Sequence, residues 1–277
     1  MSSAQGRAIM VIGSTGMLGT GLVHYFRGQG RDVREISRRE FVIGRDPASK
    51  LDLEGVGAVL NAAGMVNRRL AGGRNETEAY LVNSLFPHHL ADLCEPRGVP
   101  FIHVSTDCVF DGRQGPTTEA STPNATDLYG RSKWFGEPRN ALVLRTSIIG
   151  PERNNFYMLL SWFLAQTGEC RGFTNHLWNG ITTLELARGI GTILSEEGLY
   201  THGVRHVYGE DTTKYDLLCA IAKVFRHPVR IVPCEDAASR DTRLRTIHPA
   251  FLDRLQVRGL DRQIAELLPL YESLRRG

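Results

Sequence analysis

The chain has 277 residues, of which 42% are hydrophobic and 23% are charged, and its formal net charge is +3. This is the composition of a globular protein, and the small net charge argues against nucleic acid or an anionic membrane as the main partner. No apolar run approaches the roughly 20 residues that a membrane-spanning helix needs, and the polar start Met1–Arg7 lacks the apolar core of a secretion signal.

The cysteines are odd in number, scattered, and without Cys-x-x-Cys spacing. This pattern argues against a disulfide framework and against a zinc site, so no metal is predicted. It indicates a reducing compartment, and we therefore expect a cytoplasmic protein. The five residues are Cys94, Cys108, Cys170, Cys219 and Cys234.

A buried strand is predicted at Ala8–Ile12, followed by the turn Gly13-Ser-Thr-Gly16-Met-Leu-Gly19 and a helix that continues from Thr20 to Arg27. Strand, glycine-rich turn and helix together expose backbone N–H groups to a pyrophosphate at a helix N-terminus. The spacing is G-x-x-G-x-x-G, and a glycine turn without a ligand is the alternative. The predicted dinucleotide contacts here are Gly13, Thr15, Gly16, Met17, Leu18 and Gly19.

The second strand is predicted at Asp32–Ile36 and is followed by Ser37, Arg38 and Arg39. An NAD-binding strand usually ends in an acidic residue that binds the ribose 2′-hydroxyl. Two guanidinium groups and a hydroxyl suit a 2′-phosphate instead, which favours NADP(H) over NAD(H). A solvated basic turn is the alternative interpretation.

The third strand, Gly57–Leu60, ends in small residues that would let a flat cofactor lie against the backbone. The residues are Asn61, Ala62, Ala63 and Gly64, and Asp52 and Leu53 before the strand are predicted to meet the adenine edge. A loop is expected at Arg68–Glu76, and then a helix at Thr77–Glu95 that Pro87 kinks or breaks.

The next strand, Phe101–Val104, delivers Ser105-Thr106-Asp107 to its carboxyl end, where open α/β sheets bind their ligands. His103 lies inside this strand, and a buried structural histidine is expected there rather than a catalytic one. With a further strand at Ala141–Leu144, the alternation of strands and helices predicts an α/β fold with a doubly wound, Rossmann-like parallel sheet.

Tyr129 and Lys133 are four residues apart, a spacing that puts both side chains on one helix face. An ammonium beside a phenol lowers the phenol pKa and prepares the hydroxyl for proton transfer. A hydroxyl from Thr106 could hold a substrate oxygen in line for this proton transfer. Alone, the pair is common on solvated helix faces.

After residue 150 the pattern changes. Helices are predicted at 154–167, 183–194, 214–225 and 261–268, where Pro269 ends or kinks the last one, and strands at 204–208 and 229–232. We therefore expect a cofactor-binding domain at 1–150 and a mainly substrate-binding lobe at 151–277, interleaved with the first.

Taken together, these segments resemble an extended short-chain dehydrogenase/reductase, and within that superfamily the dTDP-4-dehydrorhamnose reductase family. The combination of STD…VFDG and YGxSKxxGE is specific to this branch. The matching stretches are GSTGMLG (13–19), NAAG (61–64), STDCVFDG (105–112), YGRSKWFGE (129–137) and LRTS (144–147).

The resemblance implies a catalytic triad of Thr106, Tyr129 as proton donor and Lys133 as the residue that holds the nicotinamide ribose, with Asn83 ordering the site. Ser105, Tyr129 and Lys133 are also expected to touch the cofactor. The chain departs from the family at Cys108, where a tyrosine is usual, and at 174–183, which replaces the usual substrate segment; a packed connector is the alternative there. The predicted substrate contacts are Met65, Thr106, Asp107, Cys108, Tyr129, Asn175, His176, Trp178 and Asn179.

The resemblance further implies NADPH-dependent reduction of a keto group, at C4, on a nucleoside-diphosphate deoxysugar, by a protein that could form a homodimer. Two alternatives stay open. One is an epimerase or dehydratase of the same superfamily that retains NAD⁺, and the other is a non-catalytic protein similar to the regulatory subunit of methionine adenosyltransferase.

Overall fold

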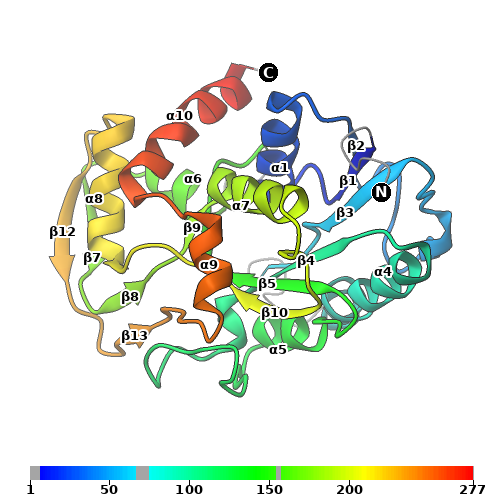
Figure 1. Ribbon diagram of the computed structural model, residues 1–277. Helices are drawn as coiled ribbons and strands as arrows, with labels where there is room; N and C mark the ends of the chain where they lie inside the picture. The colour runs from blue at the N-terminus through cyan, green and yellow to red at the C-terminus, as the bar shows by residue number, and fades with distance from the viewer. Residues whose placement is uncertain (1–6, 67–74, 154–156, 277) are drawn as a thin grey trace.

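A computed structural model of the protein describes residues 7–66, 75–153 and 157–276. At its centre lies a six-stranded sheet in the order β10-β5-β4-β3-β1-β2, in which every neighbouring pair is parallel (Figure 1). This confirms the predicted α/β fold with a parallel, Rossmann-like sheet. The strands are β1 (Ala8–Ile12), β2 (Val33–Ile36), β3 (Val56–Asn61), β4 (Phe101–Thr106), β5 (Leu142–Thr146) and β10 (Gly203–His206).

Helices cover both faces of this sheet (Figure 1). The side chains of β1 alternate: Ile9 and Val11 pack with α1 (Met17–Gly28) and α7 (Thr183–Ser195), whereas Met10 and Ile12 pack with α4 (Phe86–Cys94). All five residues of β1 are buried. A strand covered on both faces needs a continuous apolar sequence, which is why Ala8–Ile12 could be predicted as a buried strand.

The strand order reverses between β1 and β3, because β2 lies on one side of β1 and β3 on the other. In open parallel sheets, the crevice for a ligand lies at such a reversal, outside the carboxyl ends of the strands. Gly13 follows β1 and Ala62 follows β3. The fold therefore brings the two predicted cofactor segments to the same crevice.

A second layer of elements forms a smaller lobe around its own apolar core. Its helices α8 (Lys214–Phe225) and α10 (Leu260–Arg276) pack on each other, and its strands β7 (Glu169–Phe173) and β12 (Arg230–Cys234) pair in parallel. The two halves of the sequence interleave, because β10 joins the central sheet and α7 packs on α1. The remaining elements outside the central layer are α6 (Leu159–Leu164), β6 (Ile148–Ile149), β7 (Glu169–Phe173), β8 (His176–Trp178), β9 (Ile181–Thr182), β11 (Thr212–Thr213), α8 (Lys214–Phe225), β12 (Arg230–Cys234), β13 (Arg240–Asp241), α9 (Pro249–Leu255) and α10 (Leu260–Arg276).

Two helices differ from the sequence prediction. The helix predicted at 77–95 is α3 (Glu76–Tyr80), a π-helical turn at Leu81–Leu85 and then α4, so the irregularity comes before Pro87, which occupies the first turn of α4. Of the two predicted effects of Pro269, an end or a kink, the end is wrong, because α10 continues through Pro269 to Arg276. Pro269 lies nine residues after Leu260, inside the helix, and it removes one backbone hydrogen bond because proline has no N–H. The helix remains amphipathic, and the packing of Ile264, Leu267 and Leu270 outweighs this loss.

Most of the predicted loop 68–76 and the start of the helix predicted at 154–167 lie outside the described residues. Of the residues that the structure does describe, none forms a helix both long enough and apolar enough to cross a membrane.

Candidate active site

The glycine turn is shaped for close approach to a ligand. Gly13 has φ +79°, and a Cβ there would lie 2.7 Å from the Ala63 backbone nitrogen. A Cβ on Gly19 would collide with the Gly13 carbonyl oxygen. Only glycine therefore fits either position, and the turn lies directly against Ala62 and Ala63.

The turn also has unsatisfied polar groups that suit phosphate. The N-cap of α1 is Gly16, which has no side chain to cap the first amides. The Ser14 hydroxyl is buried, at 2% exposure, and has no hydrogen-bond partner among the described residues. A buried hydroxyl without a partner is costly unless a ligand supplies one, and a helix N-terminus attracts anions. These features fit a bound dinucleotide.

The catalytic candidates Thr106 and Tyr129 lie together. Thr106 ends β4, and Tyr129 lies in the first turn of α5 (Leu128–Phe135). The Thr106 hydroxyl accepts a hydrogen bond from the Cys108 backbone N–H at 3.1 Å and donates to Asp107 Oδ1 at 3.1 Å. It also lies close enough to the Tyr129 phenol to lower the pKa of Tyr129. Its single proton can therefore go either to Asp107 or to Tyr129.

The structure contradicts the expected effect of Lys133 on Tyr129. Burial raises the pKa of Tyr129 above its ordinary value, the neighbouring Cys108 thiol adds to this, and the Thr106 hydrogen bond opposes it. Lys133 Nζ instead donates to the Val104 carbonyl oxygen at 2.8 Å and lies 3.2 Å from His103 Nε2. Tyr129 is thus a protonated phenol at neutral pH, as a proton donor must be.

Asn83 links two segments of the site through side-chain hydrogen bonds. It lies in the π-helical turn, fully buried, and its Oδ1 accepts from the Met65 N–H at 2.8 Å. Its Nδ2 donates to the Met65 carbonyl oxygen and to Ser132 Oγ, both at 3.0 Å. Met65 in turn packs in one cluster with Tyr129. Asn83 therefore connects the segment after β3 to the Tyr129 helix.

The neighbours of Thr106 have different roles. The Ser105 hydroxyl donates to Glu137 Oε1 at 2.6 Å, so it serves a buried network in which Arg145 pairs with both oxygens of Glu137. Burial raises the pKa of Asp107, and hydrogen bonds from Thr106 and Ser147 oppose this. Ser147 was missed as a site residue by sequence reasoning, although it directly follows the LRT strand end of the motif 144–147.

The three predicted 2′-phosphate ligands differ in availability. Ser37 donates its hydroxyl and its backbone N–H to Glu40 Oε2, so Glu40 occupies it. Arg38 and Arg39 are exposed, and Arg38 lies 3.9 Å from Glu78, an ion pair too long and exposed to hold it firmly. The two arginines remain available for a phosphate.

The prediction for Asp52 and Leu53 is wrong. Both precede the first residue of β3, at the amino end of the strand, and they line a pocket with Arg7 and Arg97. The glycine turn and Ala63 follow the carboxyl ends of β1 and β3, so a whole strand length separates the two places. In the segment after β2, Ile43 packs against the cluster that contains Met65 and Tyr129.

The predicted sugar contacts in 174–183 are held by protein partners. Asn179 is 1% exposed, and its amide donates to the Leu244 carbonyl oxygen while its Oδ1 accepts from the Leu244 N–H. A buried, saturated amide cannot bind a sugar, so this prediction is wrong. Asn175 and His176 both bind Asp236. Trp178 pairs with Thr212 between β8 and β11 and packs against the core of the smaller lobe.

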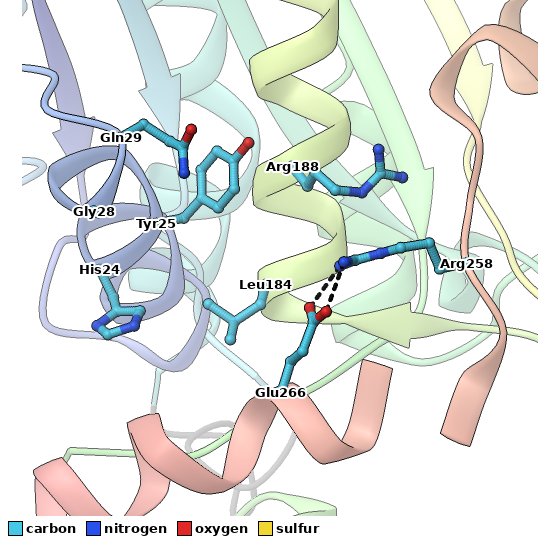
Figure 2. Close-up of a pocket in the computed structure, with 8 residues that line it drawn as sticks. All are labelled: His24, Tyr25, Gly28, Gln29, Leu184, Arg188, Arg258 and Glu266. Atoms are coloured by element: carbon cyan, nitrogen blue, oxygen red, sulfur yellow. Dashed lines mark hydrogen bonds and ion pairs between the residues drawn. The ribbon is translucent and has the colours of Figure 1, made fainter. Parts of the chain in front are cut away.

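A pocket of about 200 Å³ lies elsewhere, between α1, α7 and α10. It borders the C-terminal half of α1, whereas the glycine turn precedes that helix. Figure 2 shows Arg258 of this pocket paired with Glu266, and Arg188 is bound to Glu185. The pocket is therefore not part of the candidate active site. Its lining residues are His24, Tyr25, Gly28, Gln29, Leu184, Arg188, Arg258 and Glu266.

Comparison with known proteins agrees with this geometry. The sequence matches the family described as "RmlD substrate binding domain" over residues 7–256. The chain belongs to this family. The motifs that predicted an extended short-chain dehydrogenase/reductase of the dTDP-4-dehydrorhamnose reductase branch are thereby confirmed.

Relatives of this RmlD-family chain include enzymes and a regulatory subunit. It is 29% identical over 228 residues to dTDP-4-keto-6-deoxy-D-glucose reductase of Streptomyces niveus, covering 75% of each chain. It is also 29% identical over 248 residues to methionine adenosyltransferase 2 subunit beta of Danio rerio, covering 80% of this chain and 75% of that one. The solved dTDP-4-dehydrorhamnose reductase of Bacillus anthracis, a complex with NADP, aligns with a TM-score of 0.79 at 17% identity over 95% of this chain and 99% of that one.

Proposed function

We propose that this RmlD-family protein is an NADPH-dependent reductase that acts on the keto group, at C4, of a nucleoside-diphosphate deoxysugar. The observation that carries the proposal is that Thr106 lies close enough to Tyr129 to lower its pKa. Tyr129 packs with Met65, which follows the segment that lies against the glycine turn. A hydroxyl and a protonated phenol thus lie next to the crevice that suits a dinucleotide.

The chain's own residues carry out the proton chemistry. Bound NADPH supplies the hydride. Thr106 orients the carbonyl oxygen of the substrate, and Tyr129 gives its phenolic proton to that oxygen as negative charge develops on it. Lys133, one helical turn after Tyr129, balances the charge that is left on the phenol oxygen. Asn83 and Met65 keep the Tyr129 helix against the cofactor crevice.

Turnover of defined ketosugars tests the proposal. The protein is mixed with NADPH and with dTDP-, UDP-, GDP- or CDP-linked 4-ketosugars, and NADPH oxidation is followed with product analysis. We expect one nucleotide carrier to give turnover. Oxidation of NADPH without any reduced sugar, or no oxidation with all four, would contradict the proposal.

The two alternatives make different predictions. An epimerase or dehydratase would release stoichiometric NAD⁺ when the purified protein is denatured, whereas exposed Arg38 and Arg39 favour exchange of NADPH. A regulatory subunit would turn over no ketosugar and would co-purify with a catalytic partner. A non-catalytic subunit needs no proton donor beside a hydroxyl, so the closeness of Thr106 and Tyr129 favours the reductase.

Replacing Arg38 and Arg39 together with alanine should selectively weaken NADPH. A charged hydrogen bond contributes about 1.5–3 kcal/mol, so we expect the KM for NADPH to rise by about 10- to 100-fold while the KM for NADH stays nearly constant. Steady-state kinetics with both cofactors measure this. The matched control is Arg45→Ala, an exposed arginine of the same segment. Equal losses for NADH and NADPH would show that the two arginines do not bind the 2′-phosphate.

We assign the cofactor to residues 1–150, and we assign the substrate to the border between this part and the smaller lobe, residues 151–277 apart from α7 and β10. Since Asn175, His176 and Asn179 are bound within the protein, we infer that the sugar lies over Asp107, Cys108 and Ser147.

The cysteine pattern supports a cytoplasmic site of action; all five cysteines are free.

We also infer a homodimer. Leu85 and Phe135 are 50% and 47% exposed, and the Phe135 ring stacks on Trp134 and lies near Tyr80. The three rings form an apolar patch of the kind that covers a partner surface, and Leu85 is exposed on the π-helical turn that contacts α5. Light scattering should give twice the chain mass, and Phe135→Asp should shift it to one chain mass. The control is Ile247→Asp, at an exposed apolar residue outside the patch; a monomeric parent protein would contradict the inference.

A further inference from the structure

One aromatic side chain of the smaller lobe lies at the carboxyl ends of the central strands. Trp178 is the last residue of β8 and is half-buried. Its indole packs against Gly180, because a Cβ added to Gly180 would collide both with this ring and with the Ser147 carbonyl oxygen. The indole and Ser147 therefore lie against the same glycine, and a residue with a side chain would leave no room for them.

The register of the sheet places Ser147 beside the catalytic hydroxyl. Thr106 pairs with Thr146 where β4 and β5 end, and Ser147 is the next residue. The Ser147 hydroxyl lies close enough to Asp107 to lower the pKa of that carboxyl. The Ser147 carbonyl oxygen accepts from the Ile181 N–H at 2.9 Å. The end of β5 thus connects the indole of the smaller lobe to the catalytic hydroxyl through adjoining residues.

The acceptors of this wall already have protein partners. The Ser147 carbonyl oxygen is bound to the backbone, and the Asn179 side-chain oxygen accepts from the Leu244 N–H at 2.9 Å. The ring of Trp178 has one polar atom, the indole nitrogen, which is a donor and never an acceptor. A sugar hydroxyl that faces this wall would therefore find no free partner for its proton, whereas an apolar group would pack on the ring.

The carbon that reacts in a 4-keto-6-deoxysugar has two different neighbours. C3 carries a hydroxyl, and C5 carries the C6 methyl. A methyl against the indole removes apolar surface from water, which is favourable, whereas a hydroxyl there loses its water without gaining an acceptor. The C5 side of the sugar therefore fits against Trp178, and the C3 side faces away from it.

We propose that Trp178 is a specificity-determining residue that selects a methyl at C6 of the sugar, and that Gly180 makes room for its ring. The inference rests on the proposed reductase function, since that function places the C4 carbonyl at Thr106 and Tyr129. It deepens that function by naming the substrate class, which is 6-deoxysugars in preference to sugars with a C6 hydroxyl.

Binding of unreactive nucleotide sugars tests the proposal. Because dTDP-glucose and dTDP-6-deoxyglucose already carry a hydroxyl at C4, protein saturated with NADPH binds them without hydride transfer. Isothermal titration calorimetry gives both dissociation constants, and the UDP-linked pair is measured in the same way. An apolar wall discriminates against one added hydroxyl by about 10- to 100-fold, so we expect the 6-deoxysugar to bind more tightly by that factor. Equal affinity, or binding of neither sugar with either nucleotide, would overturn the proposal.

Trp178→Gln is the decisive variant, because its amide supplies the acceptor that a C6 hydroxyl lacks. The affinity ratio between the two sugars should then fall to about one. Trp178→Phe keeps an aromatic wall and should keep the ratio. Trp162→Phe is the matched control, at another half-buried tryptophan of the smaller lobe, and should also keep it. The parental ratio in Trp178→Gln would show that the indole does not set the selectivity.

NMR of the parent protein gives a second readout, which decides if Trp178→Gln does not fold. The chain has three tryptophans, so ¹⁵N-labelled indoles give three N–H signals, and Trp178→Phe assigns the one in question. We expect dTDP-6-deoxyglucose to shift this signal and dTDP alone to leave it in place. Equal shifts with both ligands would place the nucleotide at the ring and overturn the proposal. Neither readout needs turnover, so the expected selectivity without ketosugar reduction would contradict the reductase function alone.

Discussion

Tyr129→Phe is expected to lower kcat for ketosugar reduction by about 100- to 10,000-fold, the usual contribution of a positioned acid. The phenol oxygen is the group beside Thr106 that carries a transferable proton, and burial keeps that proton in place by raising the pKa of Tyr129. Phenylalanine retains the ring that packs with Met65, Ala79 and Val82. The fold and the cofactor crevice should therefore survive, and the loss should fall on kcat and leave NADPH binding almost unchanged.

The comparison needs two measurements on the same samples. NADPH binding, followed by its fluorescence, should agree within error between the parent protein and Tyr129→Phe. Tyr80→Phe is the matched control, because Tyr80 loses the same hydroxyl from α3, where its ring lies near Phe135. Turnover of Tyr129→Phe at the parental rate would remove Tyr129 from the mechanism.

Glu185→Ala should destabilise the protein by about 3–5 kcal/mol, the usual cost of removing one partner of a buried ion pair. The Glu185 side chain is fully buried on α7, where it pairs with Arg188 at 2.6 Å and with Arg258. It also accepts from the Arg258 backbone N–H at 2.9 Å. Loss of the carboxylate leaves two guanidinium groups, each only 21% exposed, without their common partner.

Urea unfolding followed by circular dichroism measures this loss. Glu272→Ala is the control, because the exposed Glu272–Arg276 pair, at 3.7 Å, should contribute less than about 1 kcal/mol. Burial raises the pKa of Glu185, but hydrogen bonds from Arg188 and Arg258 outweigh burial and hold it below the ordinary value. The stability due to Glu185 is therefore present above the unfolded-state pKa and is lost as the pH falls through the folded-state value. A loss equal to that of Glu272→Ala would show that the network contributes little.

The amino-acid sequence by itself determined the features that depend on local pattern. The run Ala8–Ile12 could only be a strand buried on both faces, and the Gly13–Gly19 spacing needed positions where no Cβ fits. The positions of Thr106 and Tyr129 could be predicted because a strand end and a helix start deliver them, and both carry family motifs.

Only the tertiary structure decided which polar groups are used up by protein partners. Asn179 and Asn175 carry the residue type of a sugar ligand, but Leu244 and Asp236, both more than 60 positions away, take their hydrogen bonds. Asp52 precedes β3 and therefore lies at the amino end of that strand, whereas the glycine turn and Ala63 follow the carboxyl ends of β1 and β3. Lys133 likewise meets His103 and the Val104 carbonyl oxygen of β4, partners that come together with α5 only when the chain is folded.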